Sequence, residues 1–131
     1  MKIKMTKQRK EILEIFKNSN NLLSAELIHQ KLNDKTINLS TVYRTIDIFM
    51  QNNLIGRIYL NNLSYFYLNR NDHTHYMVCE NCYRMFEIGC FENQFDQIIT
   101  ENNFEMRHHD LVIYGICEKC NRNLQGDKEV C

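Results

Sequence analysis

Two pairs of cysteines constrain the fold of this chain more than any other feature of its sequence. Cys79 and Cys82 are separated by two residues, and Cys117 and Cys120 repeat that spacing further along the chain. Each such turn presents two sulfur atoms to one side, and four thiolates are the ligand set of a closed, tetrahedral structural zinc site. The long segment between the pairs predicts a folded excursion that returns to close the site. We expect the four cysteines to hold one structural Zn²⁺, with reduced, unliganded core cysteines as the alternative.

The rest of the sequence favours a metal site over disulfides. The 131 residues contain no apolar run of the ~18 residues that suggest a membrane span, and the N-terminus lacks the apolar region of a signal peptide. We therefore expect a cytoplasmic protein that makes no membrane contact. In a reducing compartment, paired cysteines are more often metal ligands than disulfides.

The formal net charge of zero conceals a separation of charge along the chain. Residues 1–70 carry 11 Lys and Arg against 5 Asp and Glu, whereas residues 71–131 carry 5 Lys and Arg against 11 Asp and Glu. The basic part favours a polyanionic partner, and the acidic part suits the capture of cations. This separation predicts two domains, residues 1–70 and 71–131, and its alternative is chance scatter of charge.

The basic part predicts three helices followed by two strands. Helical spacing of apolar residues extends from Thr6 to about residue 17, from Ser24 to about residue 33, and from Leu39 and Ser40 to about residue 52. Two short apolar stretches, Ile55–Leu60 and Tyr65–Leu68, flank an Asn-rich turn and predict a β-hairpin. Three helices and a hairpin predict a winged helix-turn-helix.

The third predicted helix carries the polar side chains of a DNA-recognition helix. If Val42, Ile46 and Phe49 pack inward, the opposite face meets base edges and phosphates in the major groove of double-stranded DNA. The expected DNA-contact residues are Ser40, Thr41, Tyr43 and Arg44, with Lys4 and Arg9 in a basic arm and Arg57 in the hairpin. The alternative is a solvated amphipathic helix followed by an ordinary hairpin.

The acidic part predicts a small α/β domain around the cysteines, which makes the whole chain α+β. The expected elements are strands at Tyr76–Val78, Met85–Ile88 and Phe104–Tyr114 and a helix at Phe91–Glu101. The tail Asn121–Cys131 is polar, and we expect it to be mobile.

A second group of possible metal ligands surrounds the first cysteine pair. His73 and His75 point to one side if they lie in a strand, and two imidazoles at that spacing can reach one metal ion. Glu87 lies on the returning strand, and Cys90 and His109 are further ligands nearby. The alternatives are a solvated pair of histidines and, for Cys90, a small buried hydrophobic residue. We expect some of these five to hold a second divalent metal, and the soft sulfur of Cys90 favours Zn²⁺ over Fe²⁺ or Mn²⁺.

Several segments together resemble the ferric uptake regulator family of bacterial metal-dependent repressors. The segments similar to its DNA-binding domain are TKQRKEIL, LSAELIHQKL, LSTVYRTIDIF and NNLIGRI, and those similar to its dimerisation domain are HTHYMVCENC, FEIGC and HHDLVIYGICEKC. The resemblance covers about residues 4–120. It implies a homodimer that binds a palindromic operator through residues that include Tyr43 and Arg44, with structural zinc on the four cysteines.

The resemblance also implies roles for the second group of ligands. It assigns His73, His75 and Glu87 to a sensory metal site at the domain hinge, and His109 to a further site in the dimerisation domain. Cys90 is similar to a cysteine of zinc-responsive members of the family.

Two positions depart from the family pattern. Leu22 and Tyr67 stand where the hinge site usually takes a histidine and a carboxylate. The second metal is therefore expected to be held by the second domain alone or by a different ligand set. The loss of the histidine also weighs against a peroxide-sensing member, in which that residue is oxidised.

The sequence as a whole predicts a metal-responsive, DNA-binding transcriptional repressor that controls metal homeostasis, with zinc favoured as the metal. A thiol- or peroxide-responsive repressor on the same fold is the alternative. A zinc hydrolase or deaminase would need an open metal position, which a four-sulfur site lacks, so we do not expect an enzyme. A metal-storage or interaction module would show no salt-sensitive binding to DNA.

Overall fold

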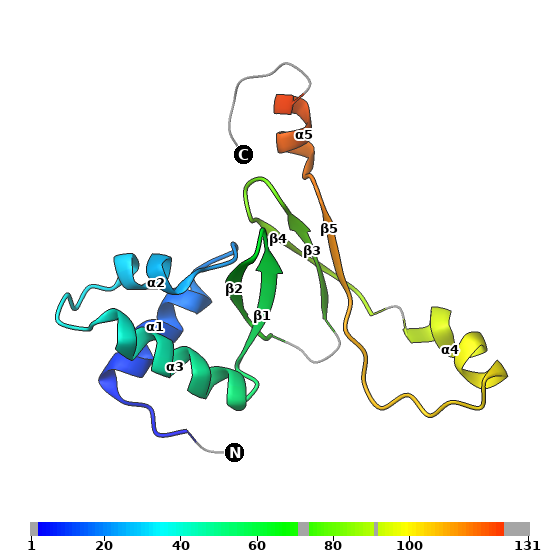
Figure 1. The fold of residues 1–131 in the computed structure, drawn as a ribbon, viewed down its shortest axis with the longest axis horizontal. Coiled ribbons are helices and arrows are strands. Elements are labelled where there is room, and N and C mark those ends of the chain that lie inside the picture. Colours follow the sequence, from blue (N-terminus) through cyan, green and yellow to red (C-terminus); the bar gives the residue numbers. More distant parts are fainter. Residues whose placement is uncertain (1–2, 71–73, 91, 125–131) are drawn as a thin grey trace. The chain divides into compact units, whose positions relative to one another are not determined.

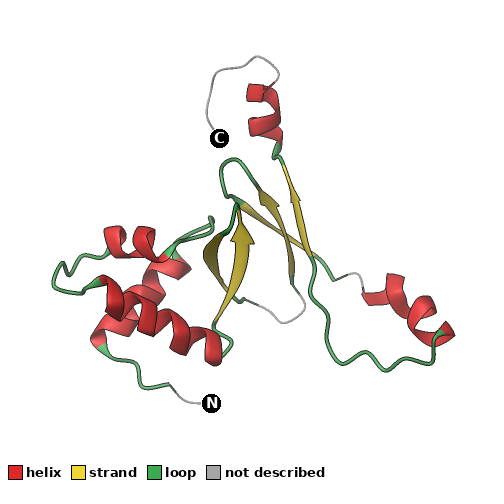
Figure 2. Cartoon of the chain, viewed as in Figure 1, coloured by secondary structure: helices red, strands yellow, loops and turns green. Residues whose placement is uncertain are grey.

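The chain forms two compact units, residues 1–70 and residues 71–131. A computed structural model describes residues 3–70, 74–90 and 92–124 (Figure 1). Each unit combines helices with a small sheet, as the colouring in Figure 2 shows, so the α+β class predicted from the sequence is confirmed. Among the described residues, every helix is too short or too polar to cross a membrane.

Unit 1 consists of three helices and a two-stranded hairpin. The elements are α1 (Lys7–Lys17), α2 (Ala25–Lys31), α3 (Leu39–Gln51), β1 (Ile55–Leu60) and β2 (Leu63–Leu68). Thr6, Ser24 and Asn38 cap the three helices, because each side-chain oxygen accepts a backbone N–H of the first turn. The apolar faces of the helices meet in one core that includes Ile12, Phe16, Ile28, Val42, Ile46, Phe49 and Phe66. This is the winged helix-turn-helix expected from the sequence.

The hairpin turn is formed by two asparagines in the left-handed backbone region. Asn61 has a φ of 52° and Asn62 a φ of 65°, and two such residues make the tight turn whose twist matches that of the strands. Leu60 therefore pairs directly with Leu63, and β2 begins two residues before the predicted Tyr65.

Unit 2 contains a three-stranded sheet and two helices. The elements are β3 (His75–Cys79), β4 (Met85–Ile88), α4 (Glu92–Glu101), β5 (Val112–Gly115) and α5 (Glu118–Leu124). β3 is the central strand, antiparallel to β4 and parallel to β5. In Figure 1 the chain leaves β4, passes through α4 and returns as β5 beside β3. This path is the folded excursion that the separation of the cysteine pairs predicted.

Two predictions for unit 2 were wrong. The long strand expected at Phe104–Tyr114 is confined to Val112–Gly115, because only that stretch pairs with β3, and the preceding residues are mostly charged or histidine. The tail expected to be mobile from Asn121 continues α5 as far as Leu124. Residues 125–131 lie outside the described part of the chain.

Candidate metal centres and nucleic-acid interface

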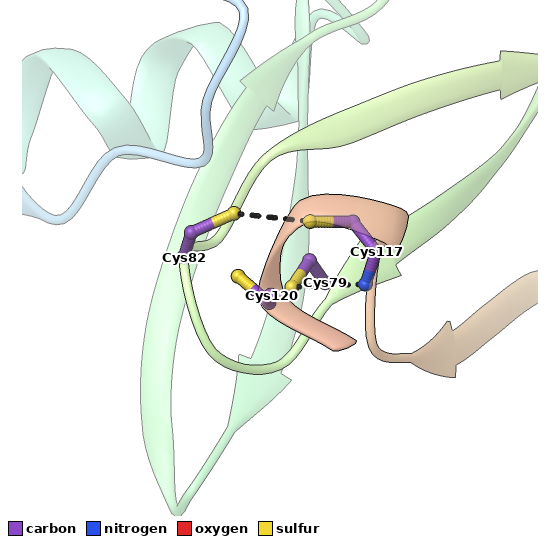
Figure 3. Close-up of side chains that lie close together, drawn as sticks. All are labelled: Cys79, Cys82, Cys117 and Cys120. Atoms are coloured by element: carbon purple, nitrogen blue, oxygen red, sulfur yellow. Dashed lines mark hydrogen bonds between the residues drawn. The ribbon is translucent and has the colours of Figure 1, made fainter. Parts of the chain in front are cut away.

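The four cysteines of the two pairs come together at one end of the sheet of unit 2. Cys79 ends β3, Cys82 lies in the turn to β4, Cys117 precedes α5 and Cys120 lies in its first turn (Figure 3). The parallel pairing of Cys79 with Gly115 places the second pair beside the first. The peptide N–H of Glu80 donates to the Gly115 carbonyl at 2.8 Å and continues this pairing beyond the strand.

The spacing of the sulfur atoms suits a tetrahedral metal site. All four Sγ atoms lie within 4.8 Å of one another, and those of Cys82 and Cys117 are 3.9 Å apart. A zinc ion with Zn–S bonds of about 2.3 Å requires sulfur–sulfur distances of about 3.8 Å. Cys79 and Cys120 are almost fully buried, whereas Cys82 and Cys117 are half-buried. The geometry therefore fits a closed structural zinc centre.

The chemical state of the sulfurs follows from their surroundings. Burial raises the pKa of Cys79, but backbone N–H groups of Cys117, Cys82 and Asn81 donate to its sulfur and together lower the pKa to about 7. Burial and the neighbouring thiols raise the pKa of Cys82. Coordination by all four sulfurs requires each cysteine in its reduced, thiolate form.

A second cluster of ligands lies at the other end of β3. His75 opens β3, Cys90 follows β4, and His109 precedes β5. Nε2 of His75 is 3.1 Å from Nε2 of His109, which in turn is 3.2 Å from Sγ of Cys90. Tetrahedral zinc with Zn–N bonds of about 2.0–2.1 Å and Zn–S of about 2.3 Å requires separations of about 3.3 and 3.6 Å. These donors reach that geometry if they move apart by a few tenths of an ångström, and three of them leave a fourth position open.

Glu87, another expected ligand of unit 2, does not join this cluster. Glu87 pairs with Tyr76 across β3 and β4, and the alternation of side chains along β3 places it on the opposite face of the sheet from His75. His73 lies outside the described residues. Of the five expected ligands, the described part of the chain thus brings His75, Cys90 and His109 together.

At the two positions that depart from the family pattern, the side chains pack against neighbouring residues. Leu22 is buried, with 2% of its surface exposed, and it offers no metal ligand. The ring of Tyr67 occupies the space directly beside Gly56 on the neighbouring strand, where a Cβ atom at position 56 would collide with it. Neither residue supplies the imidazole or carboxylate expected at its position.

The outer face of α3 presents Tyr43 and Arg44 to solvent. Tyr43 is 45% exposed, and its hydroxyl donates to Oε1 of Glu26 on α2 at 2.7 Å. Nη2 of Arg44 donates to Oγ1 of Thr41 at 3.2 Å. The hydroxyls of Ser40 and Thr41, which are among the expected DNA-contact residues, donate to Oδ1 of Asn38 at 2.8 and 2.9 Å. Both hydroxyl donors are therefore already engaged by Asn38, the residue that caps the helix.

The remaining basic residues of the expected interface lie around two hollows in unit 1. Arg9 lines a hollow of about 200 Å³ with Thr41 and Arg44, and its guanidinium also donates to the Lys4 carbonyl at 2.7 Å. Arg57 lines another hollow, of about 420 Å³, together with Tyr43. Lys4 itself is exposed in the arm. The helix-turn-helix thus groups several of the residues predicted to meet DNA.

Comparison with known proteins assigns the chain to a family. The model of the ferric uptake regulator family matches residues 1–114. The chain belongs to this family. It is therefore a metal-responsive, DNA-binding repressor that works as a dimer, and it is not an enzyme.

Individual relatives agree with the family assignment. A ferric uptake regulation protein from Bordetella parapertussis is 34% identical over 128 residues, covering 93% of this chain and 92% of the relative. The peroxide operon regulator of Bacillus subtilis is 32% identical over 127 residues, covering 92% of this chain and 86% of the relative. The solved structure of a ferric uptake regulator from Francisella tularensis with iron superposes with a TM-score of 0.75 at 31% identity, covering 91% of this chain and 95% of that one.

Proposed function

We propose that this chain is a zinc-responsive member of the family, which represses its target genes when a regulatory Zn²⁺ binds to unit 2. The observation that carries the proposal is the cluster of His75, Cys90 and His109. Two imidazoles and a thiolate form a soft to borderline ligand set, which suits Zn²⁺ better than the harder Fe²⁺ or Mn²⁺. Because the protein acts on DNA, we also place it in the cytoplasm.

The four cysteines have a separate, structural role in this proposal. A set of four sulfurs leaves no open position for a substrate or a regulatory ligand. Coordination by both pairs would join the turn after β3 to the start of α5, and so would close the excursion between them. We therefore assign Cys79, Cys82, Cys117 and Cys120 to a permanent Zn²⁺ that stabilises unit 2.

Unit 2 also offers a surface for the partner of the dimer. Met77 and Ile113 are exposed apolar side chains that pair on neighbouring strands, on one face of the sheet, and Phe95 and Ile98 add more on α4. Exposed apolar surface of this extent on a small domain favours association. We propose that these residues contact a second copy of the chain, which would place two α3 helices on the half-sites of a palindromic operator.

In unit 1, we propose that duplex DNA is bound by the exposed face of α3 and by the basic residues beside it. Tyr43 and Arg44 lie on that face, Arg9 and Arg57 line the adjoining hollows, and Lys4 adds charge in the arm. Ser40 and Thr41 stay in this interface through their position in the first turn, although Asn38 holds their hydroxyls.

The regulatory ligands explain how a metal could influence the dimer. Cys90 and His109 flank the segment that carries α4, and His75 lies on the central strand. Coordination by all three would tie both ends of that segment to the sheet, and α4 contributes part of the proposed dimer surface. A metal shifts the equilibrium between two dimer arrangements only by its differential affinity for them. Coordination by the three ligands would give such a difference, because it would favour the arrangement in which both ends of the α4 segment are held against the sheet.

Variants of the regulatory cluster test the proposal. Reduced dimer carrying only structural zinc is assayed against an operator selected from random duplexes, with Zn²⁺, Fe²⁺ or Mn²⁺ added back. We expect Zn²⁺ to strengthen operator binding on the order of tenfold or more, and Cys90→Ser and His109→Ala to lose this response while they remain folded. His108→Ala is the matched control, because its exposed imidazole is outside the cluster.

Three outcomes would contradict parts of this proposal. If operator binding is unchanged after the weaker site is selectively chelated, metal control by this cluster is wrong. If Fe²⁺ or Mn²⁺ restores binding and Zn²⁺ does not, the assignment of zinc is wrong. If oxidant abolishes binding while metal removal leaves it intact, the thiol-responsive alternative is correct.

A further inference from the structure

Glu26 lies beside the recognition helix although it belongs to α2. Its carboxylate accepts the hydroxyl proton of Tyr43 across 2.7 Å, and both side chains are exposed. Neither residue belongs to the buried core of unit 1. The contact therefore has its effect on the outer face of α3, which is the surface proposed above to meet DNA.

This hydrogen bond uses the single donor that Tyr43 has. A phenol carries one O–H donor and can otherwise only accept, and an ionised carboxylate only accepts. The same contact lowers the pKa of Glu26 and raises the pKa of Tyr43, so both groups keep these protonation states near neutral pH. Together the two side chains present acceptors to an approaching ligand.

A surface made of acceptors can select between DNA bases. In the major groove, guanine presents the acceptors O6 and N7 and thymine presents O4, whereas adenine and cytosine carry an exocyclic amino group that donates. The negative charge of Glu26 also opposes a phosphate at this point. The acceptor pair formed by Glu26 of α2 and Tyr43 of α3 therefore suits an adenine or a cytosine and disfavours both a phosphate and the other two bases.

The surroundings of the pair add to this preference. Glu26 and Tyr43 line the hollow of about 420 Å³ together with Asp47 and Arg57. Asp47 is exposed and lies one helical turn after Tyr43, so a second carboxylate faces the same space. Arg57 offers a cation in the lining of the same hollow, and it can meet a phosphate while the acceptors meet a base.

We propose that Glu26 is a specificity-determining residue, which holds Tyr43 as a hydrogen-bond acceptor so that the pair reads the amino group of an adenine or cytosine in each operator half-site. This inference rests on the proposed DNA-binding role of α3, and it assigns to α2 a part in base readout.

Selection from random duplexes, followed by affinity measurements with each base at the affected position, tests the inference. The zinc-loaded, reduced dimer is compared with the variants E26A, E26Q, Y43F and E26A/Y43F. We expect the wild type to select A or C at one position of each half-site, and E26A and Y43F to lose on the order of tenfold discrimination at that same position. The double variant should lose no more than either single variant, since the two residues act as one unit.

Two further variants separate orientation from charge. E26Q removes the negative charge but keeps an oxygen that accepts the Tyr43 hydroxyl, so we expect it to retain the base preference. E14A removes an exposed carboxylate from α1, whose described ion pair is with Lys17 at 4.0 Å, and should also retain the preference. Circular dichroism confirms folding of each variant.

The inference is overturned if Y43F alters base preference and E26A does not, or if E26A strengthens binding to all sequences equally. Selection of G or T at the position that Y43F affects would also overturn it. The DNA-binding proposal fails separately, if the wild-type dimer selects no sequence and Arg44→Ala leaves binding to duplex DNA unchanged.

Discussion

Cys79 shows how the fold prepares one residue for its chemistry. A free thiol is mostly protonated at neutral pH, but three backbone N–H groups surround this sulfur and hold its pKa at about 7 despite burial. Because the folded pKa lies below the usual value, the thiolate form is favoured above about pH 7 and is lost as the pH falls through that value. Metal binding needs the thiolate, so the site is best prepared for zinc on the alkaline side.

Cys82→Ser removes one sulfur from this centre and should abolish tight zinc binding. We expect the purified reduced variant to retain less than one tightly bound zinc per chain and to lose about 2 kcal/mol or more of stability, in line with structural metal sites that contribute directly to folding. Elemental analysis and thermal unfolding measure both effects. Cys90→Ser is the control and should keep the tight zinc, and a variant Cys82→Ser with full zinc content would exclude Cys82 as a ligand.

At the scale of an element, the start of α3 depends on one asparagine. Oδ1 of Asn38 accepts the Thr41 backbone N–H at 2.9 Å and also the hydroxyls of Ser40 and Thr41. The first turn of the recognition helix and the orientation of its two hydroxyls therefore share a single acceptor. An N-cap of this kind contributes about 1 kcal/mol to stability.

Asn38→Ala should therefore lower the free energy of unfolding by about 1 kcal/mol, whereas Asn38→Asp, which keeps the acceptor, should lower it much less. Urea unfolding followed by circular dichroism checks this. Asn20→Ala, an exposed loop change, serves as the control. Equal stability of the Ala and Asp variants at position 38 would show that the cap contributes nothing.

At the scale of the whole molecule, basic and acidic residues are separated between the two units. Unit 1 carries the excess of Lys and Arg, and unit 2 the excess of Asp and Glu. Binding of basic residues to phosphates releases counterions, so the affinity falls as salt rises. If unit 1 binds the DNA as proposed, we expect the salt dependence to come from the basic residues of unit 1.

The logarithm of operator affinity should decrease linearly with the logarithm of salt concentration. Replacing Arg44 or Lys4 by Ala should reduce the magnitude of the slope by about 1 for each phosphate that the variant no longer neutralises. Arg122→Ala, which removes an exposed cation from α5 of unit 2, should leave the slope unchanged. Fluorescence anisotropy over a salt series provides the measurement, and an equal effect of Arg122→Ala would place the DNA surface elsewhere.

Local sequence patterns were sufficient to predict most of the helices and strands. The caps Thr6 and Ser24, the strands Ile55–Leu60 and Met85–Ile88, and the inward face of α3 are all where the pattern predicts them. These features depend on neighbours within a few residues, so periodicity and capping residues report them directly. The extent of β5 was mispredicted because a strand ends where its partner ends, and the pattern of one segment does not contain that information.

The sequence by itself determined the class of fold, the two cysteine pairs and the family, because local patterns of residue types identify all three. Only the tertiary structure decided which distant ligands meet. It joined His75 to Cys90 and His109, separated Glu87 from them across the sheet, and placed Glu26 against Tyr43. The physical reason is that strand pairing and helix packing fix distances between segments far apart in the chain, and those distances select the ligands of a metal and the donors left free for DNA.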